Sequence, residues 1–279
     1  MDKALERAAA LKLDCLAMFV RNQVQWHVPP LRDAAAATFR RRREELGIGP
    51  IVAHGSYLVN LAGLADVRRK SVAAMKADLA RCDRLGIEYL VFHPGSRSDA
   101  ARGIRLIADA LNRIVAAPRP AGATGKRPMI LLETTAGQGS GIGHTFEQLA
   151  DILSRLDQPE CFGVCLDTCH VFAAGYDLRT PAAYRKTMRQ FDAAIGLARL
   201  RAVHLNDARK DLASRVDRHA HIGAGLIGAG GFAHLVNDRR LTSVPMILET
   251  PKGRDDAGRD WDEVNVAAVR SLVRRRNKR

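Results

Sequence analysis

The chain has 279 residues, of which 47% are hydrophobic, and this is enough for one complete core. Lysine and arginine (44) outnumber aspartate and glutamate (30), so the formal net charge is +14 at pH 7. A surface field of that sign favours polyanions, nucleic acid above all. Five cysteines, an odd number, indicate a reducing compartment rather than a disulfide framework. Without an apolar run of about 18 residues or a signal-type N-terminus, we expect a soluble cytoplasmic protein.

Helix-like and strand-like segments alternate along the chain. A helix is expected over Lys3 to Leu11 and a first strand over 14–20 (DCLAMFV). Further helices are expected at 66–85 and 99–115, where apolar residues recur every three or four positions. Six short apolar runs each break at a His, Glu or Asp followed by turn residues: 51–56 (IVAHGS), 89–96 (YLVFHPGS), 129–137 (MILLETTAG), 162–170 (FGVCLDTCH), 200–208 (LRAVHLNDA) and 244–253 (VPMILETPKG). Continuous runs of this kind are typical of strands covered on both faces of a parallel sheet.

This alternation predicts an α/β protein with one TIM (β/α)8-type barrel domain over 1–279, ending in a basic tail at about 272–279. We count about seven strands where such a barrel has eight, and the missing one is the first, at the N-terminus. Its loss would leave two neighbouring strands with unpaired edges. Either the natural start lies upstream of Met1, or the barrel is open or patched.

Nine residues of metal-ligand type are spread along the chain, most of them at the strand ends. In a parallel barrel these ends open on one face, where the active site forms. Imidazoles and carboxylates without thiolate suit zinc or manganese in an open catalytic site. Nine ligands exceed the need of one ion, and two or three ions sharing a carboxylate are typical of phosphate-ester hydrolysis. The candidates are His54, His93, Glu133, Asp167, His170, His204, Asp217, His219 and Glu249.

Other conspicuous residues are expected to be structural. Cys161, Cys165 and Cys169 lack the spacing of a zinc knuckle and are interpreted as small core residues. The glycine-rich run 137–143 has neither a P-loop ending nor a dinucleotide fingerprint, so it predicts a flexible loop beside the metal site and no nucleotide cofactor. Four histidines outside the strand-end pattern are expected to be ordinary core or surface residues: His27, His144, His221 and His234.

Seven segments, in order from about Asn22 to Gly253, resemble the endonuclease IV family of apurinic/apyrimidinic endonucleases. They are HGSYLVNLA, FHPGS, LETTAGQGSGIG, GVCLDTCHVFAAGYD, VHLNDA, SRVDRHAHIG and ILETPKG. The resemblance implies a TIM barrel with three zinc ions, or manganese at one of the positions. It implies hydrolysis of double-stranded DNA on the 5′ side of an abasic site, which leaves a 3′-hydroxyl and a 5′-deoxyribose phosphate. We expect a monomer that binds no membrane.

The resemblance also assigns roles position by position. It implies that His54, His93 and a bridging Glu133 hold one zinc. It implies that Glu133, Asp167, His204 and Glu249 hold the second, and that His170, Asp217 and His219 hold the third. Glu133 and Glu249 are the implied catalytic residues, with Glu249 placed to orient or deprotonate the attacking water. Tyr57 and Leu58 correspond to the loop that enters the DNA. The chain departs from the family pattern at Val24, where an arginine can stand, and at Ala224, where a glutamate is common.

Two other functions are kept as alternatives. A metal-dependent sugar or sugar-phosphate isomerase or epimerase on a related barrel needs only Glu133, Asp167, His204 and Glu249 around one or two ions. A non-catalytic binder of damaged DNA is suggested by the missing strand and by Val24. Metal content separates them: about three zinc ions per chain favours the nuclease, one or two favours the isomerase, and none with retained DNA binding favours the binder.

Overall fold

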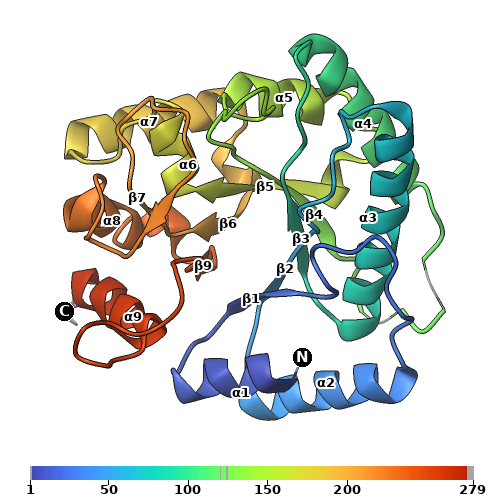
Figure 1. Ribbon diagram of the computed structural model, residues 1–279, viewed down its shortest axis with the longest axis horizontal. Coiled ribbons are helices and arrows are strands. Elements are labelled where there is room, and N and C mark those ends of the chain that lie inside the picture. Colours follow the sequence, from blue (N-terminus) through green and yellow to red (C-terminus); the bar gives the residue numbers. More distant parts are fainter. Residues whose placement is uncertain (1, 120, 124, 275–279) are drawn as a thin grey trace.

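The computed structural model describes residues 2–119, 121–123 and 125–274 (Figure 1). The expected basic tail therefore lies outside the described residues from position 275 onward. Seven parallel strands form one sheet in the order β1-β2-β3-β4-β5-β6-β9. Their bounds are β1 (Leu16–Phe19), β2 (Ile51–His54), β3 (Tyr89–Phe92), β4 (Met129–Glu133), β5 (Phe162–Asp167), β6 (Leu200–His204) and β9 (Met246–Ile247). A small antiparallel pair, β7 (Asp207–Ala208) with β8 (His219–Ala220), stands apart from it.

Helices surround this curved sheet on its outer side (Figure 1). They are α1 (Asp2–Ala10), α2 (Asp33–Leu46), α3 (Ala65–Leu85), α4 (Ala100–Val115), α5 (Phe146–Ser154), α6 (Thr168–Ala173), α7 (Pro181–Ala194), α8 (Gly228–Val236) and α9 (Trp261–Leu272), with short 3₁₀ turns at Pro159–Cys161, Leu197–Arg199 and Arg239–Leu241. The helices expected at 3–11, 66–85 and 99–115 are α1, α3 and α4. The prediction of a TIM-type barrel that lacks one strand is confirmed.

The burial of the strands explains their continuous apolar runs. Every residue of β2 and β5 is buried, because one face packs on the helices and the other points into the barrel. An inner layer consists of alternate strand residues, and it is separate from the larger core between strands and helices. Its buried members are Val52, Val91, Leu131, Cys165, Ala202 and Ile247.

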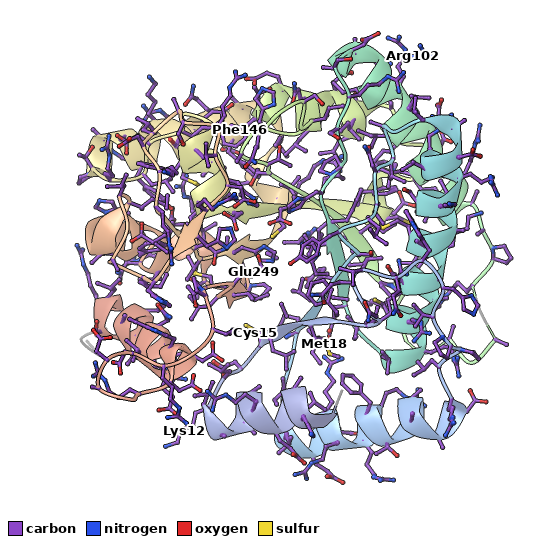
Figure 2. The ribbon with its side chains drawn as sticks, viewed as in Figure 1. Lys12, Cys15, Met18, Arg102, Phe146 and Glu249 are labelled. Carbon is purple, nitrogen blue, oxygen red and sulfur yellow. The ribbon has the colours of Figure 1, made fainter. Side chains whose placement is uncertain are left out.

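The barrel is discontinuous between β1 and β9, which lie at the two ends of the strand order. A cavity of about 370 Å³ lies there, lined by residues of α1, β1, β9 and α9. Figure 2 shows Cys15 at this seam, and its Sγ lies 3.8 Å from the carbonyl oxygen of Met246. Helices α1 and α9 bridge the seam from outside: Arg7 pairs with Asp260 at 2.7 Å, and Arg270 donates to the carbonyl of Leu11 at 3.3 Å. The barrel is therefore patched rather than closed by strand pairing.

Two loops follow the first two strands and are named for them. The β1 loop comprises residues 20–32 and the β2 loop residues 55–64. Within the described residues, no helix is both long and apolar enough to cross a membrane.

Candidate metal centre

Six of the nine candidate ligands lie at the ends of six strands or one or two residues beyond them. Each follows an inner-layer residue by two positions, as His54 follows Val52 and Glu133 follows Leu131. Side chains two apart on a strand point to the same face, so a residue two beyond an inner-layer residue also faces the barrel interior. The strand geometry alone thus gathers these six at one mouth: His54, His93, Glu133, Asp167, His204 and Glu249. Figure 2 shows Glu249 within the ring formed by the strands.

The other three candidates reach the mouth by different routes. His170 lies in α6, which begins directly after β5, and the Asp167 side chain caps this helix by accepting the His170 backbone N–H at 2.8 Å. His219 lies in β8, and Asp217 precedes it by two positions. The structure thus brings all nine predicted residues together.

Glu133 occupies the centre of the cluster and is fully buried. Its Oε2 lies 3.2 Å from Nε2 of His54 and 3.1 Å from Nε2 of His93. Its Oε1 lies 2.8 Å from Nδ1 of His204, which is also 3.1 Å from Oε2 of Glu249. One carboxylate therefore touches two different sets of imidazoles, as a bridging ligand would.

A second carboxylate, Asp217, faces the remaining imidazoles. Its oxygens lie 3.0 Å from Nε2 of His170 and 3.2 Å from Nε2 of His219. Among the described residues, five groups have ligand atoms within 4.8 Å of one another, and two of these groups include a cysteine, Cys165 or Cys169. The three groups without a thiol are His54, His93 and Glu133; Glu133, Asp167, His204 and Glu249; and His170, Asp217 and His219. These are the three groups that the family resemblance implies.

Backbone carbonyls set the orientation of three of the imidazoles. Nδ1 of His54 donates to the carbonyl of Gly55 at 2.7 Å, Nδ1 of His170 to that of Thr134 at 2.8 Å, and Nδ1 of His219 to that of Glu249 at 3.1 Å. A neutral imidazole whose Nδ1 carries the proton has only a lone pair at Nε2. All three Nε2 atoms face carboxylate oxygens, which is favourable when a cation lies between them. The donor set therefore fits metal ions.

Without a cation, the protons of the cluster must supply the positive charge. Burial opposes protonation of His170 and His219, but Asp167 and Asp217 outweigh it and raise the pKa of His170 to about 10 and that of His219 to about 9. Burial acts to raise the pKa of Glu249, yet the neighbouring His204 lowers it to about 2. The pKa of Glu133 also lies well below its usual range, because His204 and His93 overcome its burial. All these pKa shifts arise because the buried carboxylates stabilise a positive charge placed next to them.

Sequence reasoning missed the polar residues that hold these ligands. Asn206 is fully buried, donates to Oδ2 of Asp167 at 2.5 Å and accepts the Glu249 backbone N–H at 2.9 Å. Thr134 accepts the Asp167 backbone N–H at 2.9 Å. Both residues lie in the same runs as the ligands, one or two positions beyond them. A buried polar residue directly after a strand-end ligand is a signal that could have identified them.

The structure also places the other residues that the sequence singled out. The glycine-rich run does lie beside the centre, since Oε1 of Gln138 accepts the Asp217 backbone N–H at 3.1 Å. His221 stacks on Trp261 with ring centroids 3.5 Å apart. Tyr57 is 62% exposed and Leu58 is half-buried. The ring centroids of Tyr57 and His54 lie 5.6 Å apart.

The cysteines behave mostly as expected. Cys165 and Cys169 are buried, whereas Cys161 is only half-buried, because it ends a 3₁₀ turn ahead of β5 rather than lying within the strand. Sγ of Cys165 lies within 4.8 Å of ligand atoms of Glu133 and His204. Burial raises the pKa of the Cys165 thiol to about 12, so it is protonated at neutral pH.

A parallel barrel with five imidazoles and four carboxylates at one mouth defines the class of metal-dependent TIM-barrel enzymes. Residues 5–272 match the family described as xylose isomerase-like TIM barrel. Curated relatives named probable endonuclease 4 are 46% identical in Chloroflexus aurantiacus, over 98% of this chain and 94% of the relative, and 48% identical in Geobacter sulfurreducens, over 99% and 92%. The crystal structure of endonuclease IV from Thermus thermophilus superposes with a TM-score of 0.83 at 38% identity, covering 97% of this chain and 93% of that one. The chain belongs to the endonuclease IV family and is a nuclease.

More distant structures share the fold alone. A D-tagatose 3-epimerase-like protein has a TM-score of 0.70 at 20% identity, over 98% of this chain and 94% of that one. This likeness is too low to favour the epimerase alternative over the nuclease.

Proposed function

We propose that the chain is a zinc-dependent apurinic/apyrimidinic endonuclease with three zinc ions, or with manganese at one of the positions. The ligands would be the three groups of nine residues, with Glu133 shared between two of them. The observation that carries this proposal is the Glu133 carboxylate, whose two oxygens face different imidazoles at 2.8–3.2 Å in a fully buried position. Such ions, when bound, provide Lewis acidity that activates water and neutralises charge on phosphate oxygens.

Glu249 is the residue that would orient the attacking water. Its side chain is 27% exposed, in contrast to that of Glu133, so it stands where the mouth meets solvent. Its low pKa keeps it ionised, and an ionised carboxylate accepts a hydrogen bond from water. The Asn206 side chain holds the Glu249 backbone in place. Glu133 would act beside it as the bridging carboxylate.

The proposed substrate is double-stranded DNA that contains an abasic site. Hydrolysis on the 5′ side would leave a 3′-hydroxyl and a 5′-deoxyribose phosphate. The net charge of +14 favours a polyanionic substrate. Tyr57 and Leu58 are the candidates for contact with DNA, because Tyr57 is exposed beside the metal centre and could fill the gap left when an abasic nucleotide is flipped out.

The working state is also part of this proposal. We expect a monomer without nucleotide cofactor that functions in the cytoplasm. The odd number of cysteines favours a reducing compartment.

The alternatives explain less of the site. An isomerase or epimerase would use Glu133, Asp167, His204 and Glu249, and it would leave the other five ligand-type residues without a role. A non-catalytic binder would not need the metal-compatible orientation of three imidazoles. The nuclease uses all nine residues.

The test is incision of a defined duplex by the purified, zinc-replete protein. The substrate carries one tetrahydrofuran abasic analogue, and the same duplex without it is the control. We expect a single cut on the 5′ side of the analogue and about three zinc ions per chain by elemental analysis. A folded, metal-loaded protein that leaves the abasic duplex intact would refute the proposed function.

A further inference from the structure

Exposed apolar side chains lie on two loops at the rim of the mouth. The β1 loop presents Val24 and Trp26, which are 63% and 36% exposed, and the β2 loop presents Tyr57. The loops touch each other, because Oγ of Ser56 donates to the carbonyl of Gln23 at 2.6 Å. Ser56 directly precedes Tyr57, and Gln23 directly precedes Val24. The contact therefore joins the two exposed segments at one rim.

A buried ion pair lies beneath the β1 loop. Nε of Arg21 is 2.5 Å from Oδ1 of Asp78 in α3, and the two side chains are only 4% and 1% exposed. A second nitrogen of the same guanidinium, Nη1, donates to the carbonyl of Gln25 at 2.7 Å. The planar fork of arginine thus connects α3 with the segment that presents Trp26, which the single ammonium of a lysine cannot do.

Further side chains of α3 hold the same loop. Arg81 donates to the carbonyls of Val20 (3.3 Å) and Pro29, and Arg84 donates to that of Leu31 at 2.7 Å. Residues 20–32 contain no helix or strand, so these contacts take the place of backbone pairing.

The ion pair reaches the β2 loop through the β1 loop. Besides donating to Gln23, Oγ of Ser56 accepts the Leu58 backbone N–H at 3.2 Å, so the turn of the β2 loop is fixed to the segment that Arg21 holds. Burial raises the pKa of Asp78 to about 6, while Arg21 acts in the opposite direction by stabilising the carboxylate. The pair of Arg21 and Asp78 therefore supports the β1 loop directly and the β2 loop through the hydrogen bond between Ser56 and Gln23.

Stability alone is a poor explanation for such a pair. The desolvation of two buried charges often cancels their attraction, and apolar residues of similar size are commonly as stable or more so. We propose that Arg21 and Asp78 are positioning residues for DNA recognition: their ion pair fixes the β1 loop relative to the β2 loop, so that Val24, Trp26 and Tyr57 meet the duplex as one surface. This inference rests on the proposed function, because the ligand is duplex DNA.

Steady-state incision of the abasic duplex by Asp78→Asn and Arg21→Lys tests the inference. We expect KM to rise by about tenfold or more, because small displacements of binding groups are costly. The kcat should stay within about twofold and the zinc content should be unchanged, because no metal ligand moves. If both variants only melt at a lower temperature and keep the wild-type KM, the pair is merely structural and the inference is overturned. A fall in kcat at unchanged KM would overturn it as well.

Asp83→Asn is the matched control. Asp83 lies on the same helix, is equally buried, and accepts from Nε of Arg119 at 2.9 Å, yet the contacts that link α3 to the two loops do not involve it. Its loss should lower the melting temperature without changing KM. A rise in KM equal to that of Asp78→Asn would show that any weakening of α3 has this effect and would refute a specific role for the Arg21 pair.

A measurement without DNA separates this inference from the proposed function. The chain has two tryptophans, so Trp261→Phe leaves Trp26 as the one fluorescent reporter in the β1 loop. Asp78→Asn in this background should increase the acrylamide quenching of Trp26, whereas Asp83→Asn should not. Unchanged quenching would overturn the positioning role even in an active nuclease. Increased quenching in a protein that cuts no DNA would refute the proposed function and, with it, the recognition role, while establishing the loop anchor.

Discussion

The mouth of the barrel and the seam between β1 and β9 are built in different ways. At the mouth, strands β2 to β6 pair continuously, and most ligands lie at the strand ends or one or two residues beyond them. At the seam, side chains of α1 and α9 bridge a cavity of about 370 Å³ in place of strand pairing. Glu249 belongs to both regions, because it follows the two-residue strand β9 and faces His204. Most candidate ligands therefore lie on the well-paired part of the sheet, and Glu249 is the one candidate ligand that lies next to the seam.

The largest effect is expected at that shared residue. Glu249→Gln should lower kcat on the abasic duplex by about 10²- to 10⁴-fold, because the amide cannot accept a proton or orient water as the carboxylate does. Incision kinetics measure the loss of activity, and circular dichroism checks that the variant is still folded. Glu263→Gln, an exposed change on α9, is the control and should keep wild-type activity. Wild-type incision by the Glu249 variant would remove Glu249 from the chemistry.

Asn206→Ala tests how the ligands at the mouth are supported. Asn206 ties Asp167 to the Glu249 backbone, so its loss should lower zinc affinity by about 10- to 100-fold without removing a ligand. Competition with a fluorescent chelator measures the change. Asn112→Ala is the control and should leave zinc affinity unaltered, because Asn112 is a partly buried residue of α4 that donates to the carbonyl of Arg155 and accepts the Asp157 backbone N–H, outside the mouth. Equal affinities for both variants would contradict the support role of Asn206.

Metal removal should make the stability of the mouth depend on pH. In the metal-free protein, His170 and His219 have folded-state pKa values of about 10 and 9, above the unfolded value near 6.5. Their stabilising contribution is full below about pH 6.5 and is lost as pH rises through about 9 to 10. Urea denaturation at several pH values should show this decline after chelation. Zinc-loaded protein, whose imidazoles are neutral ligands, should lack it; the same decline in both forms would contradict the metal assignment.

Tyr57→Ala tests recognition at the rim. We expect about a tenfold loss of preference for abasic over intact duplex, because the exposed ring no longer fills the gap left by the missing base. The effect on kcat at saturation should be small. Leu64→Ala, a 75% exposed apolar residue at the end of the same loop, is the control. Equal losses on both duplexes would contradict a role of Tyr57 in discrimination.

The smallest effect is expected at the seam. Arg270→Ala removes donors to the carbonyls of Leu11 and Lys12 and should lower the free energy of unfolding by about 1 kcal/mol. Urea denaturation measures this loss, and zinc content serves as the readout for the mouth. Zinc content should be unchanged. A loss of zinc would show that contacts at the seam other than those of Glu249 also affect the metal centre.

The barrel and the residue types at its mouth could be predicted from local patterns in the sequence. Apolar runs such as MILLE and FGVCLD are readable because strand burial is a local pattern, and Glu133 and Asp167 end these runs. Parallel strands of a barrel then bring the run ends together whatever the connecting helices contain. The three ligand groups could therefore be named before any contact was known, with the help of the family resemblance.

The contacts that support the ligands, the loops and the seam could not be predicted from the sequence. Arg21 meets Asp78 across 57 positions, Asn206 meets the Glu249 backbone across 43, and Arg270 meets Lys12 across 258. These contacts follow no local period, because each depends on how helices and loops pack around the sheet. From sequence alone, a charged residue on a helix is expected to be exposed to solvent. Asp78 is buried only because of tertiary packing, so its role could not be predicted from the sequence.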